Sequence, residues 1–111
     1  MNIENTSLSQ ALKILGDEKR FMILRLLLEH DLCVEALAKR LDISKSAVSQ
    51  HLKILREAGL VQGEKRGYFT HYSVMRERIK EIAAELEALT AIEKSRCLPG
   101  SGCGGPITIK E

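Results

Sequence analysis

The stretch at residues 44–61, SKSAVSQHLKILREAGLV, decides the fold of this chain. Val48, Leu52 and Leu55 recur at helical spacing, so one face of the predicted helix is apolar. The opposite face has no acid before Glu57. It consists of hydroxyl, amide and cationic side chains: Lys45, Ser46, Ser49, Gln50, Lys53 and Arg56. Because Ser and Gln reach base edges and Lys and Arg meet phosphates, this face is typical of a helix in the DNA major groove, although an ordinary surface helix would share it.

The segments before this stretch decide between the two interpretations. Residues 7–16 predict a first capped helix, and residues 17–30 a second helix with a wide apolar face. Residues 33–41 predict a short third helix, and residues 42–43 a tight turn before the polar-faced helix. A short helix, a tight turn and a second helix form the helix-turn-helix motif that binds DNA.

Beyond Gly59 the hydrophobic period becomes alternating, which predicts a β-hairpin. Residues 60–64 are expected to form its first strand, residues 65–67 (Lys-Arg-Gly) its turn and residues 68–74 its second strand. On its own this would be any exposed hairpin with a solvated turn. Directly after a recognition helix, a hairpin with a basic tip predicts a DNA-contacting wing. The expected fold class is therefore mainly α with a β-hairpin, a winged helix-turn-helix.

Residues 76–93 predict a long helix whose apolar residues alternate at spacings of three and four. They are Ile79, Ile82, Ala83, Leu86, Leu89 and Ile92. Part of this stripe can pack on its own domain, but the helix follows a unit that is already complete. We therefore expect a partner helix, and a homodimer that reads near-palindromic double-stranded DNA with two recognition helices.

Composition limits the class of protein. The 111 residues suffice for one small domain with an aliphatic core, since Trp is absent and aromatic residues make up 4%. The net charge of +2 is uninformative, but residues 44–76 hold six basic and two acidic side chains, whereas residues 77–94 hold three and five. This local positive charge fits a DNA footprint. No signal peptide, membrane-spanning run or catalytic constellation is recognisable, so a cytoplasmic protein that is not an enzyme is expected.

The three cysteines point to thiol chemistry. An odd number, Cys33, Cys97 and Cys103, fits a disulfide-stapled secreted domain poorly. In a reducing cytoplasm thiols more often bind metals or sense oxidants. Two of the three lie in the Gly/Pro-rich segment RCLPGSGCGGP, so we expect two regions: a DNA-binding and dimerisation domain at residues 1–94, and a pliable Cys/Gly-rich tail at residues 95–111.

Three blocks of the chain resemble the ArsR/SmtB family of bacterial metal-responsive winged-helix repressors. They are LGDEKRFMIL at residues 15–24, DLCVEALA at residues 31–38 and SAVSQHLKILREAGLV at residues 46–61, and HYSV at residues 71–74 also matches. The resemblance implies a homodimeric repressor that binds operator DNA when free and leaves it when an ion binds. It is closest to arsenic-type members with C-terminal cysteines, and no cofactor would be needed for DNA binding itself.

Residue roles follow from the resemblance. Dimerisation through the first and last helices would use Leu8, Leu12, Ile79, Ile82, Leu86 and Leu89. His51 lies inside the recognition-helix block, so it is expected to be structural or DNA-facing rather than an ion ligand, and it is included with the helix and wing cations. The predicted DNA-binding set is Lys45, Ser46, Ser49, Gln50, His51, Lys53, Arg56, Lys65 and Arg66.

The family's ion sites match only in part. The arsenic-type motif C-V-C is present as Cys33 and Val34, but Glu35 replaces the second cysteine. The zinc-type site of Asp and His on the last helix is rejected, because residues 77–92 contain no His. Soft ions prefer thiolates, so we predict a metal site formed by Cys97 and Cys103 with Cys33 as third ligand, suited to As(III) or Sb(III).

Other interpretations remain open at this point. Cys33 is as readily a buried apolar residue as a ligand, and His30 is a further candidate donor. Cys97 and Cys103 would also suit a redox or reactive-sulfur switch, or a Cd(II) or Pb(II) site. A winged helix that binds protein, with a merely solvated basic face, is the alternative from a different class.

Overall fold

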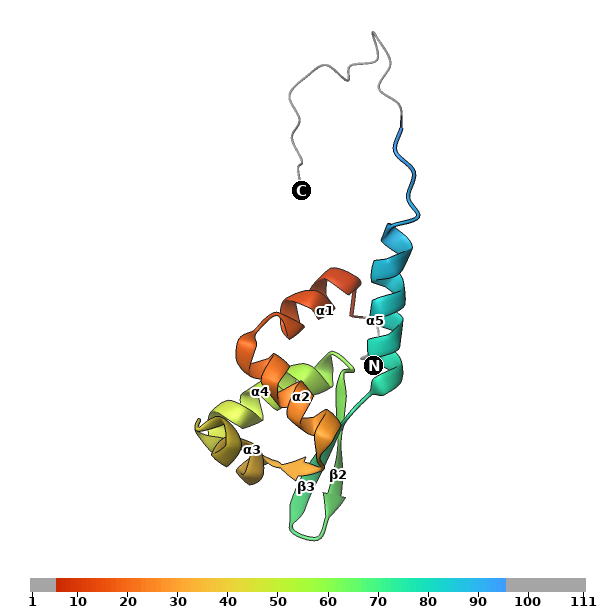
Figure 1. Ribbon diagram of the computed structural model, residues 1–111. Helices are drawn as coiled ribbons and strands as arrows, with labels where there is room; N and C mark the ends of the chain where they lie inside the picture. The colour runs from red at the N-terminus through yellow and green to blue at the C-terminus, as the bar shows by residue number, and fades with distance from the viewer. Residues whose placement is uncertain (1–5, 96–111) are drawn as a thin grey trace.

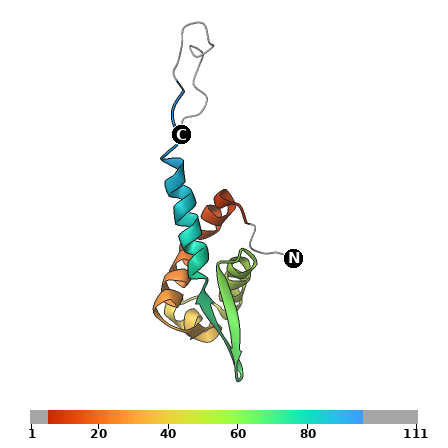
Figure 2. The ribbon, with the colours of Figure 1, turned by 90° about the vertical axis from the view of Figure 1, so that its right-hand side faces the viewer.

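The architecture is that of a computed structural model, which describes residues 6–95. Figure 1 shows helices α1 to α4 packed together, with the β2–β3 hairpin at one end and α5 beside them. Figure 2 shows that α5 and the hairpin point in opposite directions. The elements are α1 (Leu8–Leu15), α2 (Glu18–Glu29), β1 (Leu32–Cys33), α3 (Val34–Leu41), α4 (Lys45–Glu57), β2 (Val61–Arg66), β3 (Phe69–Val74) and α5 (Arg76–Leu89). The predicted winged helix-turn-helix is confirmed.

Local capping explains where the helices begin. The side chains of Ser7, Asp17 and Ser44 each accept a hydrogen bond from the backbone N–H three residues later, at 3.2, 3.0 and 3.0 Å. These bonds satisfy donors that the first helical turn leaves free, so the three predicted helix starts are confirmed. The backbone N–H of Arg20, which bonds the Asp17 carboxylate, lowers the pKa of that group.

The helix-turn-helix packs around an aliphatic core. Val48 and Leu55 on the inner side of α4 are completely buried, and Leu52 is almost so. They lie in one cluster with Ile23 of α2 and Leu37 of α3. Every buried side chain among the described residues is apolar or Tyr72, and each large aliphatic one stabilises the fold by about 1.5–3 kcal/mol. The turn between α3 and α4 passes through Asp42, whose φ of 57° lies in the left-handed region that Asp tolerates.

A short strand that the sequence did not reveal joins the helix-turn-helix to the hairpin. β1 pairs antiparallel with β3, with Leu32 opposite Tyr72 and Cys33 opposite His71. The sheet order is β1-β3-β2. Because Cys33 belongs to this strand and caps α3, the third helix begins at Val34 rather than at Cys33. Two residues are too few to show an alternating pattern.

The hairpin turns later than predicted. Lys65 pairs with Thr70 and Arg66 with Phe69, so both cations lie in β2 and the loop is Gly67 and Tyr68. The expected turn at residues 65–67 is therefore wrong. Gly67 has φ +65°, and a two-residue hairpin loop requires such positive φ values, which Gly adopts without strain. The prediction stopped the first strand at the charged residues, although an exposed edge strand accommodates them.

The last helix leaves part of its apolar stripe uncovered. α5 ends at Leu89 rather than at Glu93. Ile82 is 4% exposed, whereas Leu86 and Leu89 are 40% and 52% exposed. The stripe therefore divides into a half that packs on its own domain and a half that faces outward. Among residues 6–95, no helix has the length and apolarity that a bilayer crossing requires.

Candidate nucleic-acid interface

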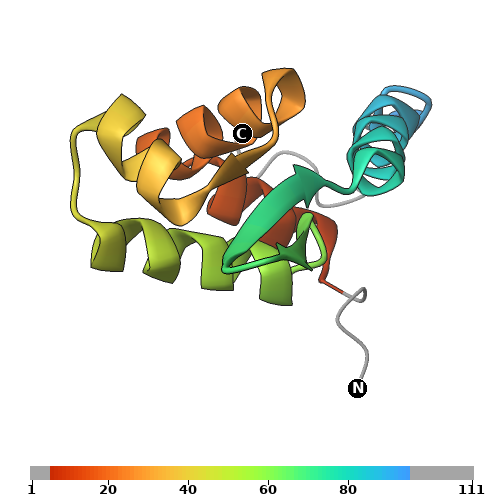
Figure 3. The same ribbon diagram turned by 90° about the horizontal axis from the view of Figure 1, so that it is seen from below.

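The outer face of α4 presents the hydrogen-bonding and cationic side chains that were predicted. All six are exposed: Lys45, Ser46, Ser49, Gln50, Lys53 and Arg56. Ser44 caps the helix, and its last turn contains the cation Arg56. Figure 3 shows α4 along one edge of the molecule, where a duplex can approach it. Since Val48, Leu52 and Leu55 hold the inner side of the helix, its outer side is presented in a fixed orientation.

The wing lies next to the first turn of α4. A pocket of about 290 Å³ is lined by Lys45 together with Tyr68 and Phe69 of the hairpin and Glu35 of α3. Tyr68 occupies the tip and is 97% exposed, and Phe69 is 51% exposed. Tyr68 was not among the predicted DNA-binding residues, because the cations before it were expected to form the tip. The two-residue loop at Gly67 is the signal that would have found it.

The two wing cations differ in their surroundings. The guanidinium of Arg66 donates to Asp31 at 3.0 Å and to Glu64 at 3.1 Å. These hydrogen bonds, the one to Glu64 foremost, raise the pKa of Arg66 above its ordinary value. Lys65 is exposed and forms no ion pair with any described residue. Arg66 therefore ties the wing to the α2–β1 loop, and Lys65 is the wing cation available to a phosphate.

His51 is directed inward, unlike the rest of the predicted DNA-binding set. It is half-buried, and its Nδ1 lies 3.4 Å from Nη1 of Arg20 on α2. Arg20 also donates from Nε to the carbonyl oxygen of Ile14 at 2.8 Å, so it joins α1, α2 and α4. The ring of His51 therefore lies against α2, and its contact with DNA stays a prediction.

The described residues supply one thiol to the predicted ion site. Cys33 is a half-buried free cysteine at the start of α3, and its side chain makes no capping hydrogen bond. Glu35 is exposed, and His30 lies 4.0 Å from Glu29. Within residues 6–95, no three side chains of His, Cys, Asp or Glu gather closely enough to hold a metal ion. Cys97 and Cys103 lie outside the described residues, so a trigonal thiolate site depends on them.

The residues predicted to form the dimer interface differ in how far they are exposed to solvent. Leu12 of α1 and Leu86 and Leu89 of α5 are exposed, whereas Leu8 and Ile79 are half-buried. Ile82 packs inside its own chain. The outward apolar surface at α1 and α5 is therefore formed by Leu12, Leu86 and Leu89.

The fold and the polar face of α4 define a DNA-binding protein of the winged helix-turn-helix class. The family model for the bacterial regulatory proteins of the arsR family matches residues 17–62. A solved ArsR-like transcriptional regulator from Rhodococcus superposes with a TM-score of 0.70 at 33% identity, covering 76% of this chain and 79% of that one. The chain belongs to the ArsR family of DNA-binding transcriptional regulators, and it is not an enzyme.

Two curated relatives carry the names of different ions. The arsenical resistance operon repressor of Escherichia coli is 47% identical over 64 residues, which are 57% of this chain and 55% of that protein. The cadmium resistance regulatory protein CadC of Listeria innocua is 35% identical over 82 residues, 73% of this chain and 69% of that protein. Both relatives support membership of the family, and their names refer to different elements, arsenic and cadmium.

Proposed function

We propose that this protein is a homodimeric transcriptional repressor that leaves its operator when a thiolate-binding inducer, As(III) or Sb(III), is bound. The observation that carries the DNA-binding part is the outer face of α4, which is exposed and free of acid from Lys45 to Arg56. Such a face meets a polyanion without repulsion, and its hydroxyl and amide groups match base edges.

The DNA contacts divide into two kinds. Ser46, Ser49 and Gln50 are assigned to base edges, because they are exposed and their hydroxyl and amide groups can hydrogen-bond bases. The cations are assigned to phosphates: Lys45, Lys53, Arg56 and Lys65. Arg66 reaches a phosphate only by exchanging its hydrogen bonds with Asp31 and Glu64, so we assign it a supporting role.

A homodimer would cover the exposed apolar surface. Leu12, Leu86 and Leu89 expose apolar surface on α1 and α5, and exposed apolar surface of this kind marks a site of association. A two-fold axis there would place two copies of α4 for two half-sites about one helical turn apart, roughly 34–36 Å. The operator would then be near-palindromic.

The inducer is proposed from the thiols and from the relative named for arsenic. Trivalent arsenic and antimony favour three thiolates, and Cys33, Cys97 and Cys103 are the three that the chain contains. We propose residues 1–94 as the DNA-binding and dimerisation domain and residues 95–111 as the segment that brings two thiols to the site. Deprotonation of the thiols on binding makes the affinity for the ion rise with pH.

One experiment tests the whole proposal. Duplexes are selected from a random pool by the purified protein under anaerobic conditions, and the selected operator is titrated with As(III). Salt-dependent binding followed by release supports the proposal. No salt-dependent binding refutes DNA recognition by α4. Release by Cd(II) alone refutes the metalloid inducer, and release by oxidant with a mass loss of about two hydrogens identifies a disulfide switch instead.

A further inference from the structure

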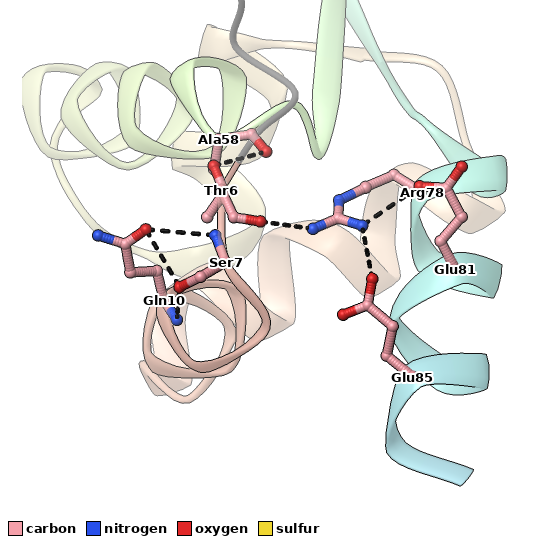
Figure 4. Close-up of polar contacts among 7 residues, drawn as sticks. All are labelled: Thr6, Ser7, Gln10, Ala58, Arg78, Glu81 and Glu85. Carbon is pink, nitrogen blue, oxygen red and sulfur yellow. Dashed lines mark hydrogen bonds and ion pairs between the residues drawn. The ribbon is translucent and has the colours of Figure 1, made fainter. Parts of the chain in front are cut away.

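The beginning of α5 is joined to the end of α4 through a single residue, Thr6. Nη2 of Arg78, in the first turn of α5, donates to the carbonyl oxygen of Thr6 at 2.8 Å. Oγ1 of Thr6 donates to the carbonyl oxygen of Ala58, the C-cap of α4, at 3.4 Å. Figure 4 shows Thr6 between these two groups. The hydrogen bonds run from the helix with the exposed apolar stripe to the helix with the DNA-facing surface.

Thr6 is held in place at the start of α1. The backbone N–H of Ser7 donates to Oε1 of Gln10 at 3.3 Å, and the N–H of Gln10 donates to Oγ of Ser7 at 3.2 Å (Figure 4). This reciprocal cap fixes the backbone directly after Thr6. The carbonyl that receives Arg78 is therefore a defined point.

The guanidinium of Arg78 is nearly buried, and its contacts position α5 more than they stabilise the fold. Its side chain is only 12% exposed, and it approaches Glu81 at 3.2 Å and Glu85 at 3.8 Å on its own helix. Its Nε is buried and has no partner among the described residues. The desolvation of a nearly buried guanidinium with one unsatisfied donor offsets part of its attraction to Glu81 and Glu85.

A second hydrogen bond holds the N-terminal end of α5. The backbone N–H of Met75, the N-cap of α5, donates to the carbonyl oxygen of Leu60 at 2.8 Å. The guanidinium of Arg76 also donates to the carbonyl oxygen of Leu28 at 3.1 Å, and Ile82 packs in the core on the inner side of α5. These contacts hold α5 against α2 and the core, and the bond from Arg78 to Thr6 is the one that leads toward the end of α4.

We propose that Arg78 and Thr6 are positioning residues that set the angle between α5 and α4, and thereby the separation of the two recognition helices in the dimer. This inference rests on the proposed homodimeric repressor. Leu86 lies eleven residues beyond Met75, about 16 Å along the helix. A swing of about 12° would move it about 3.4 Å, the rise of one base pair. The hydrogen-bonded link from Arg78 through Thr6 to Ala58 therefore decides which half-site spacing the dimer accepts.

The test uses Arg78→Met, which keeps the apolar stem of the side chain and removes the bond to Thr6. The matched control is Lys80→Met, which removes the same charge from the same helix. Lys80 is 74% exposed, and within residues 6–95 its one ion pair is with Glu77. Spin labels on an unnatural amino acid at Glu57, an exposed residue of α4 outside the DNA-binding set, report the separation of the two recognition helices without DNA. The effect on DNA binding is measured as the affinity for operators whose half-site spacing is changed by one base pair and for a single half-site.

We expect one narrow distance in the wild type and in Lys80→Met, and a broad distribution in Arg78→Met. The preference for the native spacing should fall from at least tenfold to less than about threefold, with single half-site affinity unchanged. An unchanged distance distribution and spacing profile in Arg78→Met overturns the inference. If Arg78→Met does not fold, the inference is tested with Thr6→Val, which removes only the hydroxyl, by the same two measurements. Thr6→Ser, which keeps the hydroxyl, is its control. Absence of any dipolar signal in the wild type refutes the proposed homodimer instead.

Discussion

Lys65 and Arg66 are neighbours in β2, and replacing Lys65 by alanine is expected to weaken binding to all DNA sequences. Lys65 is exposed and forms no ion pair with a described residue, whereas the guanidinium of Arg66 is bonded to Asp31 and Glu64. A lysine that meets a phosphate displaces a condensed counterion, so its contribution depends on salt and not on base sequence.

The size of the effect follows from the number of contacts. Each phosphate contact contributes about 0.9 to the slope of log affinity against log salt. A dimer with Lys65→Ala loses two such contacts, so the slope becomes shallower by about 1.8. Between about 50 and 200 mM salt, the affinity ratio of wild type to variant should therefore shrink by about 12-fold.

Fluorescence anisotropy of a labelled operator and of a scrambled duplex, measured over this salt range, checks the prediction. Lys80→Ala on α5 is the control, since it removes the same charge far from the outer face of α4. Asp31→Asn should have the opposite effect, because it frees Arg66 from one of its two acids. If Lys65→Ala retains the wild-type slope, the assignment of Lys65 to a phosphate is refuted.

Three further outcomes are expected. Gln50→Ala should cost about 1–3 kcal/mol on the selected operator and relax sequence preference, as competition with single-base variants will show; equal losses on all sequences would exclude base contact. Leu86→Asp should place an unpaired charge in the dimer interface, cost several kcal/mol and give monomers by sedimentation, whereas an unchanged dimer would exclude this surface. Cys97→Ser and Cys103→Ser should bind operator normally but remain bound in As(III), and Cys33→Ser should respond weakly; normal release by the double tail variant would remove the tail thiols from the site.

Features that depend on neighbours along the chain could be predicted from the sequence. The caps at Ser7, Asp17 and Ser44 each involve a backbone donor three residues away, so the local sequence contains both partners. The same holds for the polar face of α4, because a helix of fixed period assigns each side chain to a side. The winged helix-turn-helix and the exposed polar face of α4 were therefore determined by sequence alone.

Contacts between distant segments were decided by the tertiary structure. Arg66 meets Asp31 across 35 positions, His51 meets Arg20 across 31, and Arg78 meets Thr6 across 72. A charge pattern shows which residues are cationic, but the partner that an arginine finds depends on how the chain closes on itself. For this reason two equivalent wing cations were expected, while the folded chain pairs Arg66 with two acids and leaves Lys65 without an ion pair among the described residues. The contact of His51 with Arg20 could not be predicted for the same reason.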